Sequence, residues 1–143
     1  MTRKIPALAV AMASLLGVFA MGCAKPAPPA AAAEEETLSR TEFTNRIENF
    51  FEYEPLRAGV SSQFLIHLTD LNDGSPVEKA EVRLMVRPKG GGAVMAVTAR
   101  VGKVTGIYVA DVKLPVAGHC DIEFHIKNDK LDERLPLKDF EVK

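Results

Sequence analysis

Alternation of apolar and polar residues is the feature that most constrains the fold of this chain. It recurs in four segments, residues 62–70, 80–87, 107–114 and 120–127, which turn residues such as Gly, Pro, Asn and Asp separate. Successive side chains of a strand point to opposite faces, so each segment predicts a strand with one buried face. The residues expected to point inward are Phe64, Ile66, Leu68, Val82, Leu84, Val86, Tyr108, Ala110, Val112, Leu114, Cys120, Ile122, Phe124 and Ile126.

Three further segments complete the predicted sheets. Residues 94–101 predict a strand, and residues 135–142 predict a closing strand that Pro136 places at a sheet edge or at a strand start. Residues 39–42 fit a helix capping box, whereas residues 46–53 alternate and are rich in aromatic side chains, which favours a strand there. About seven strands in roughly 100 residues predict an all-β fold, an immunoglobulin-like antiparallel β-sandwich without the antibody Cys pair and Trp.

The N-terminal residues indicate export. Two basic residues among the first four precede an apolar stretch that ends at Gly22 and Cys23. Charged, apolar and small residues in this order are typical of a secretory signal. Residues 20–23, Ala-Met-Gly-Cys, resemble a bacterial lipobox, although Ala and Met replace the commoner Leu and small residue. We expect residues 1–22 to be removed as a lipoprotein signal peptide and Cys23 to carry the lipid, with an uncleaved helical anchor as the alternative.

A low-complexity segment rich in Ala, Pro and Glu follows Cys23. Such a composition cannot form a core and predicts a disordered, semi-extended tether. We therefore expect a linker over residues 23–41 and one sandwich domain over residues 42–143. The expected location is the periplasm, anchored to the inner or the outer membrane, with the outer membrane favoured because Ala24 follows the lipid site.

Several motifs resemble one known module. They are residues 51–59, residues 62–71, the pair Pro76-Val77, residues 106–108 and residues 114–118. Together they resemble the β-sandwich module in the N-terminal part of some periplasmic adaptors of heavy-metal resistance-nodulation-division (RND) efflux pumps, and are similar to stand-alone YtkA-like domains. The chain is too short for the other adaptor domains. The resemblance implies an accessory or binding domain in the periplasm, with an RND efflux protein or another envelope protein as partner.

A metal site is the sharpest chemical hypothesis that the residues offer. His67, His119, Cys120 and His125 are all the histidines and the one cysteine after Cys23. Imidazole and thiolate groups bind zinc and copper, and methionine thioethers such as those of Met85 and Met95 favour Cu(I). Adjacent His119 and Cys120 are the best pair. The alternative is that alternation places Cys120 in the core and His67 on a solvated face.

Composition and motifs exclude other classes of function. Without the two basic residues of the signal, 16 basic residues remain against 19 acidic ones, and the chain has no Trp, so nucleic-acid binding is not expected. No Gly-x-Ser-x-Gly elbow, phosphate loop or paired metalloprotease histidines occur, so no enzyme is expected. Three hypotheses remain: an interaction module accessory to envelope heavy-metal efflux, a direct copper- or zinc-binding chaperone, and a structural envelope lipoprotein without ligand.

Overall fold

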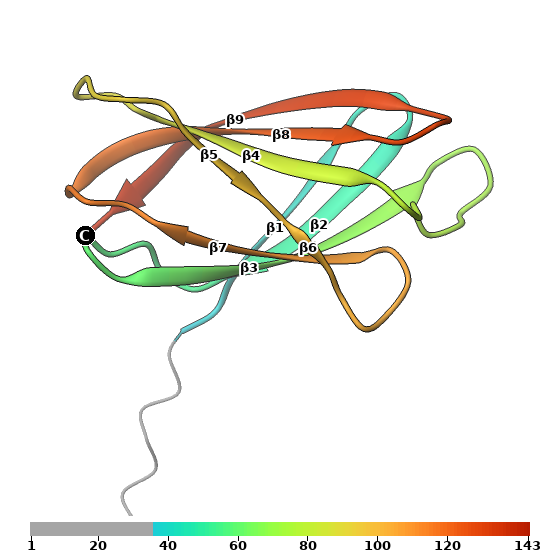
Figure 1. The fold of residues 1–143 in the computed structure, drawn as a ribbon, viewed down its shortest axis with the longest axis horizontal. Coiled ribbons are helices and arrows are strands. Elements are labelled where there is room, and N and C mark those ends of the chain that lie inside the picture. Colours follow the sequence, from blue (N-terminus) through green and yellow to red (C-terminus); the bar gives the residue numbers. More distant parts are fainter. Residues whose placement is uncertain (1–35) are drawn as a thin grey trace, which may run out of the picture. The chain divides into compact units, whose positions relative to one another are not determined.

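Two antiparallel β-sheets packed as a sandwich make up the folded part of the chain (Figure 1). The computed structural model describes residues 36–143. The expected signal peptide (residues 1–22), the lipid site at Cys23 and the first part of the expected linker lie outside these described residues. Within residues 36–143, no helix is long and apolar enough to span a membrane.

The two sheets contain five and four strands. Along the first sheet the order is β1 (Leu38–Phe43), β2 (Ile47–Tyr53), β3 (Ser61–Asp70), β7 (Ile107–Lys113) and β6 (Arg100–Val101). Along the second it is β5 (Met95–Thr98), β4 (Glu81–Pro88), β8 (Gly118–Lys127) and β9 (Asp132–Val142). As predicted for Pro136, β9 is an edge strand, where a residue without an N–H is tolerated.

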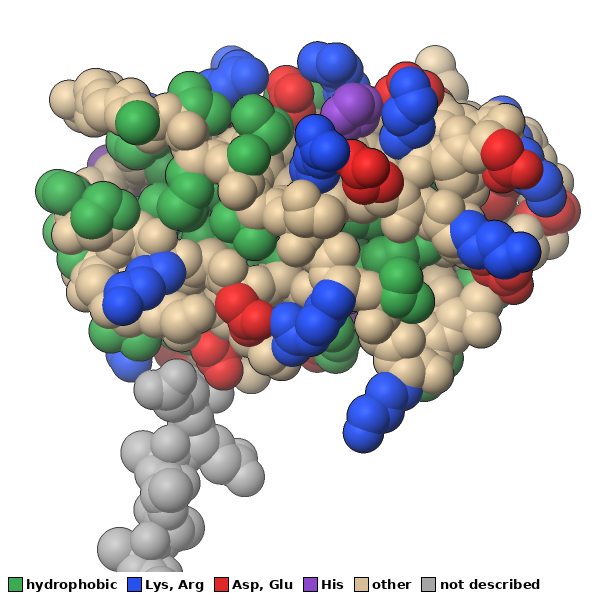
Figure 2. Space-filling view, viewed as in Figure 1, with side chains coloured by type: hydrophobic (Ala, Val, Ile, Leu, Met, Phe, Trp, Pro, Cys, Tyr) green, Lys and Arg blue, Asp and Glu red, His purple; other side chains and the backbone are tan. Residues whose placement is uncertain are grey.

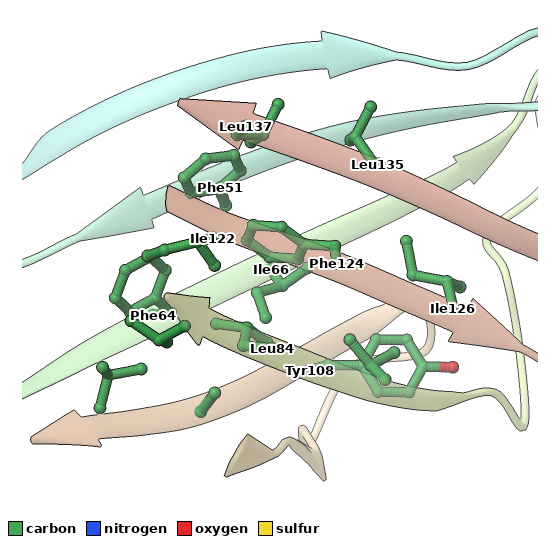
Figure 3. Packing of buried hydrophobic residues seen from close by; sticks show 14 of the residues in the cluster. Phe51, Phe64, Ile66, Leu84, Tyr108, Ile122, Phe124, Ile126, Leu135 and Leu137 are labelled. Atoms are coloured by element: carbon green, nitrogen blue, oxygen red, sulfur yellow. The ribbon is translucent and has the colours of Figure 1, made fainter. Parts of the chain in front are cut away.

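The core lies between the sheets, and the alternation predicted its members correctly. All fourteen residues expected to point inward are buried. Figure 3 shows several of them, among them Phe64 and Phe124, beside Phe51 of β2 and Leu135 and Leu137 of β9. The Phe51 ring from β2 lies 4.9 Å from the Phe124 ring and 6.0 Å from the Phe64 ring, measured between centroids. Aromatic pairs at these separations add to the stabilisation that burial provides.

The structure corrects the predicted strand count and the start of the domain. Residues 38–41, expected in the linker with a possible helical turn at 39–42, belong to β1 instead. β1 pairs with β2 along its full length, from Leu38 opposite Tyr53 to Phe43 opposite Glu48. Pairing across a hairpin is not visible in the alternation, because β1 is largely exposed and lacks an apolar face.

The expected strand over residues 94–101 is two strands in different sheets. β5 pairs with β4 in the second sheet, whereas β6 pairs with β7 in the first. The change occurs at Ala99, whose N–H donates to Val82 O at 2.8 Å before Arg100 pairs with Val109. The alternation of apolar and polar residues therefore continues through the change of sheet. A chain segment that passes from one sheet of a sandwich to the other keeps the same side toward the core.

The side chain of Arg40 connects the two sheets at the opposite edge of the sandwich, where β1 and β9 are the edge strands. Arg40 Nη1 donates a 3.2 Å hydrogen bond to Lys138 O, and its guanidinium carbon lies 4.8 Å from the Phe140 ring centroid. Its Nη2 also donates to Glu42 Oε1 at 2.9 Å. Arg40 thus ties the first sheet to the second across an edge where no backbone ladder connects them.

Candidate functional site: an apolar groove at one end of the sandwich

His67 lies on the outer face of the first sheet, where it is partly exposed. Its ring is 5.3 Å from the Phe50 ring between centroids, and its Nε2 atom is 4.0 Å from Glu52 Oε2. That separation is too long for a hydrogen bond, and Nε2 has no hydrogen-bond partner within residues 36–143. His67 is therefore packed beside an aromatic ring on one outer surface of the sandwich.

His125 lies on the outer face of the second sheet. Its Nε2 atom is 2.8 Å from Asp132 Oδ1, and Lys127 Nζ donates to Asp132 Oδ2 at 2.8 Å. The hydrogen bond from Lys127, followed by that from His125, lowers the pKa of Asp132 from 3.8 to about 2. His125 thus belongs to a surface ion-pair cluster on the sheet opposite to that of His67.

His119 and Cys120 follow Gly118 at the start of β8, with side chains on opposite faces. His119 is exposed, whereas Cys120 is 1% exposed and belongs to the core, so the expected burial of this thiol is confirmed. Burial raises the pKa of Cys120. Met95 lies on β5, and β4 separates that strand from β8. Neighbouring strands are about 4.8 Å apart, so Met95 is about 10 Å from the strand of Cys120.

These placements keep the four candidate metal ligands apart. Their side chains occupy two outer faces, one strand end and the core. Within the described part of the chain, no group of three or more His, Cys, Asp or Glu residues is placed to hold a metal ion. Alternation predicted which face each residue occupies, but the sheet to which each strand belongs decided their separation.

An apolar groove of about 810 Å³ opens at one end of the sandwich. Its walls are the β4–β5 loop, residues 89–94, and the β7–β8 loop, residues 114–117. Its base is formed by Leu114, Cys120 and Val142. Figure 2 shows hydrophobic side chains gathered at the end of the molecule that carries these loops. Both loops were expected only as turns between strands, although their runs of Gly, Ala, Val and Pro are an apolar signal.

Exposed valines surround this groove. Val94 and Val116, one on each loop, are 51% and 72% exposed. Val60 is 50% exposed and follows Gly59, whose N–H donates to Leu114 O at 2.7 Å. Large apolar side chains held in water are costly, and a group of them beside a groove is typical of a binding surface.

The charged groups around the groove are paired with one another, and the exposed His119 side chain also lines it. Lys89 Nζ contacts Asp139 Oδ1 at 2.5 Å and Asp121 Oδ1 at 3.5 Å. The hydrogen bond from Lys89 lowers the pKa of Asp139. The Lys89 N–H also donates to His119 O at 2.8 Å, which joins the β4–β5 loop to the start of β8. The cation in the groove wall is thus already neutralised by two carboxylates.

Two glycines allow the β4–β5 loop to form the groove wall. Gly91 and Gly92 have φ angles of +85° and +130°, which side chains with a Cβ rarely adopt. A Cβ at Gly91 would meet no atom within 4 Å. Glycine is therefore needed there for backbone conformation and not for space.

A second, polar pocket of about 450 Å³ is lined by the β3–β4 and β8–β9 connections and by Arg46. Two of its carboxylates, those of Asp70 and Asp73, are engaged in local structure. Asp70 accepts from Asn72 N at 2.9 Å and from Arg46, which lower its pKa. Asp73 accepts from Ser75 N at 2.9 Å. This pocket is thus a set of turns held by side chains, and the apolar groove is the better candidate for a binding site.

No protein-family model, curated protein or solved structure matches this chain. The geometry of the groove and the residues around it are therefore the basis for a function.

Proposed function

We propose that this chain is a non-catalytic binding module of the bacterial cell envelope, anchored through Cys23, which receives an apolar group in its end groove. The observation that carries the proposal is the groove of about 810 Å³ between the β4–β5 and β7–β8 loops. Small-ligand sites are typically concave, mostly apolar and about 300–1,000 Å³ in volume. The groove has that size and character.

The position of the groove also supports a binding role. Loops at the ends of a sandwich carry binding residues while the sheets hold those loops in place. The order β2-β3-β7-β6 corresponds to the A-B-E-D sheet of an immunoglobulin-like domain, and β5-β4-β8-β9 corresponds to C′-C-F-G. We infer an immunoglobulin-like topology with β1 added beside the A strand, which makes the two groove loops C–C′ and E–F.

The resemblance to adaptor modules of heavy-metal RND pumps extends the proposal to a partner. A domain of this kind would act in the periplasm as an accessory to metal efflux, and would contact an envelope protein through a sheet edge. The eleven-residue edge strand β9 is the longest strand available for such pairing. A copper or zinc chaperone is less well supported, because His67, His119, Cys120 and His125 do not converge on one point within the described residues.

Binding of a neutral apolar dye tests the proposal directly. Nile red would be titrated into the mature chain, residues 23–143 with Cys23→Ser, and its emission recorded. Saturable, blue-shifted emission is expected, and Val94→Asp should weaken binding by at least about tenfold because it places a charge in the apolar wall. Val104→Asp is the matched control, since Val104 is 61% exposed and does not line the groove.

Two results would count against a binding module. One is emission that never saturates with the unmodified chain. The other is equal weakening by Val94→Asp and Val104→Asp, because the dye would then be bound outside the groove. Either result would favour a structural envelope lipoprotein without ligand.

A further inference from the structure

Few of the side chains that line the groove can form hydrogen bonds. Most are those of Gly, Ala, Val and Pro, Lys89 is held by Asp121 and Asp139, and the exposed imidazole of His119 is the other strong polar group. A peptide in such a groove would lose the water around its N–H and C=O groups, and each unsatisfied group is costly. A hydrocarbon chain carries no such groups. The chemistry of the walls thus favours an acyl chain over a peptide as the occupant.

The groove also lies at the end of the sandwich where the described chain begins. Leu38, the first residue of β1, pairs with Tyr53 at the end of β2. Just beyond β2, Leu56 O accepts from Lys143 N at 2.9 Å, and Lys143 follows the groove residue Val142. Residues that precede β1 therefore join the domain at the groove end.

This arrangement limits how far the groove can be from the expected anchor. Thirteen residues, 24–36, separate Cys23 from residue 37. They would span about 40 Å in polyproline geometry, at about 3.1 Å each. A lipid at Cys23 would therefore keep the groove end, with the exposed side chains of Leu38, Val60, Val94 and Val116, within reach of the bilayer surface.

We infer that the groove end of the domain lies against the membrane and that the groove receives an acyl chain of a membrane lipid. The inference rests on the proposed function, because it identifies the apolar group that the groove binds. Because Lys89 is neutralised by its carboxylate partners, docking relies on apolar contact and does not require anionic lipid.

Binding of the chain to lipid vesicles tests the inference, provided that the lipid anchor at Cys23 is absent. The mature chain with Cys23→Ser would be floated with vesicles of neutral phosphatidylcholine, at low and at high salt. Binding is expected under both conditions, because apolar contact is little affected by ionic strength. Val94→Asp should lower vesicle binding by at least about tenfold, whereas Val104→Asp should leave it unchanged.

The depth of insertion can be read from tryptophan, since the chain has none of its own. Val116→Trp would report on the groove rim, and Val104→Trp would serve as the control, because these valines are 72% and 61% exposed. Phosphatidylcholine brominated on its acyl chains should quench the tryptophan at position 116. The tryptophan at position 104 should not be quenched.

The outcomes separate the inference from the function on which it rests. Dye binding without vesicle binding would overturn the lipid inference and leave the binding module standing. Displacement of the dye by an apolar peptide, together with no flotation of the chain with vesicles, would do the same and would favour a protein partner. Equal quenching at positions 116 and 104 would also overturn the inference. If the chain with an intact groove bound neither the dye nor vesicles, the proposed function itself would be overturned.

Discussion

The hydroxyl of Tyr108 donates a 2.8 Å hydrogen bond to the carbonyl oxygen of Val77, deep in the interior of the domain. The same hydroxyl accepts a 3.0 Å hydrogen bond from Ala80 N. Tyr108 belongs to β7 of the first sheet, whereas Val77 and Ala80 lie in the connection that leads to β4 of the second. One phenol therefore satisfies two backbone groups of the segment that crosses between the sheets.

Removal of that hydroxyl should destabilise the domain. Tyr108→Phe keeps the buried ring but leaves Ala80 N–H and Val77 C=O without their partner. The expected loss in the free energy of unfolding is about 1–3 kcal/mol, measured by urea denaturation. Tyr53→Phe, on a half-buried ring, is the control and should change stability by less than about 0.5 kcal/mol. Equal effects of the two substitutions would contradict the role of the hydroxyl.

Replacement of Asn49 should have the opposite effect. Asn49 is wholly buried on β2, and neither atom of its amide group has a hydrogen-bond partner within residues 36–143. Asn49→Leu exchanges the amide for an apolar group of similar shape, and should raise the free energy of unfolding by about 1–2 kcal/mol. The urea midpoint should rise while the m-value stays constant. Asn49→Asp should lower the midpoint, and a lower midpoint for Asn49→Leu would contradict the prediction.

Asp132 should make stability depend on pH in the acid range. Lys127 and His125 hold the pKa of Asp132 at about 2 in the folded protein, below its ordinary value of 3.8. The ionised carboxylate therefore contributes stability that is present above about pH 4 and is lost as the pH falls toward 2. Asp132→Asn should lose stability less steeply over this interval than the unmodified chain, as measured by urea midpoints between pH 2 and 5. Asp129→Asn, an exposed carboxylate nearby, should keep the unmodified slope.

Cys120 should react slowly in the folded protein. The thiol is buried, and burial raises its pKa, so little thiolate is present near neutral pH and reagents reach it poorly. With Cys23→Ser in place, Cys120 is the single thiol of the mature chain. Its reaction with Ellman's reagent is expected to be at least about a hundredfold slower in the native protein than in urea. Similar rates in both conditions would show that the groove end opens readily.

The sequence predicted which segments form strands and which of their residues face the core. It did not predict β1 or the division between β5 and β6. Each predicted inward residue from Phe64 to Ile126 is buried, because side-chain direction in a strand depends only on position along it. β1 was not predicted because backbone pairing with β2 and the contacts of Arg40 hold it in place. Neither kind of contact requires a periodic pattern of apolar residues. The change of sheet at Ala99 was missed because alternation continues through it.

At the candidate site too, the sequence predicted the faces on which side chains lie but not which residues come together. His67, Cys120 and His125 were placed on the correct faces of their strands, but their mutual distances depend on which strands share a sheet. The groove was not predicted, because two loops far apart in the chain form it. Their Gly, Ala, Val and Pro residues were visible, but only as turns.

The sequence by itself determined that the chain from residue 62 onward forms antiparallel strands with one apolar side, because binary patterning is a local property that each strand carries alone. The tertiary structure decided what the ends of those strands build. Strand order brings the β4–β5 loop beside the β7–β8 loop, and their separate apolar residues become one groove. Such neighbours are set by the packing of whole sheets, which no local pattern records.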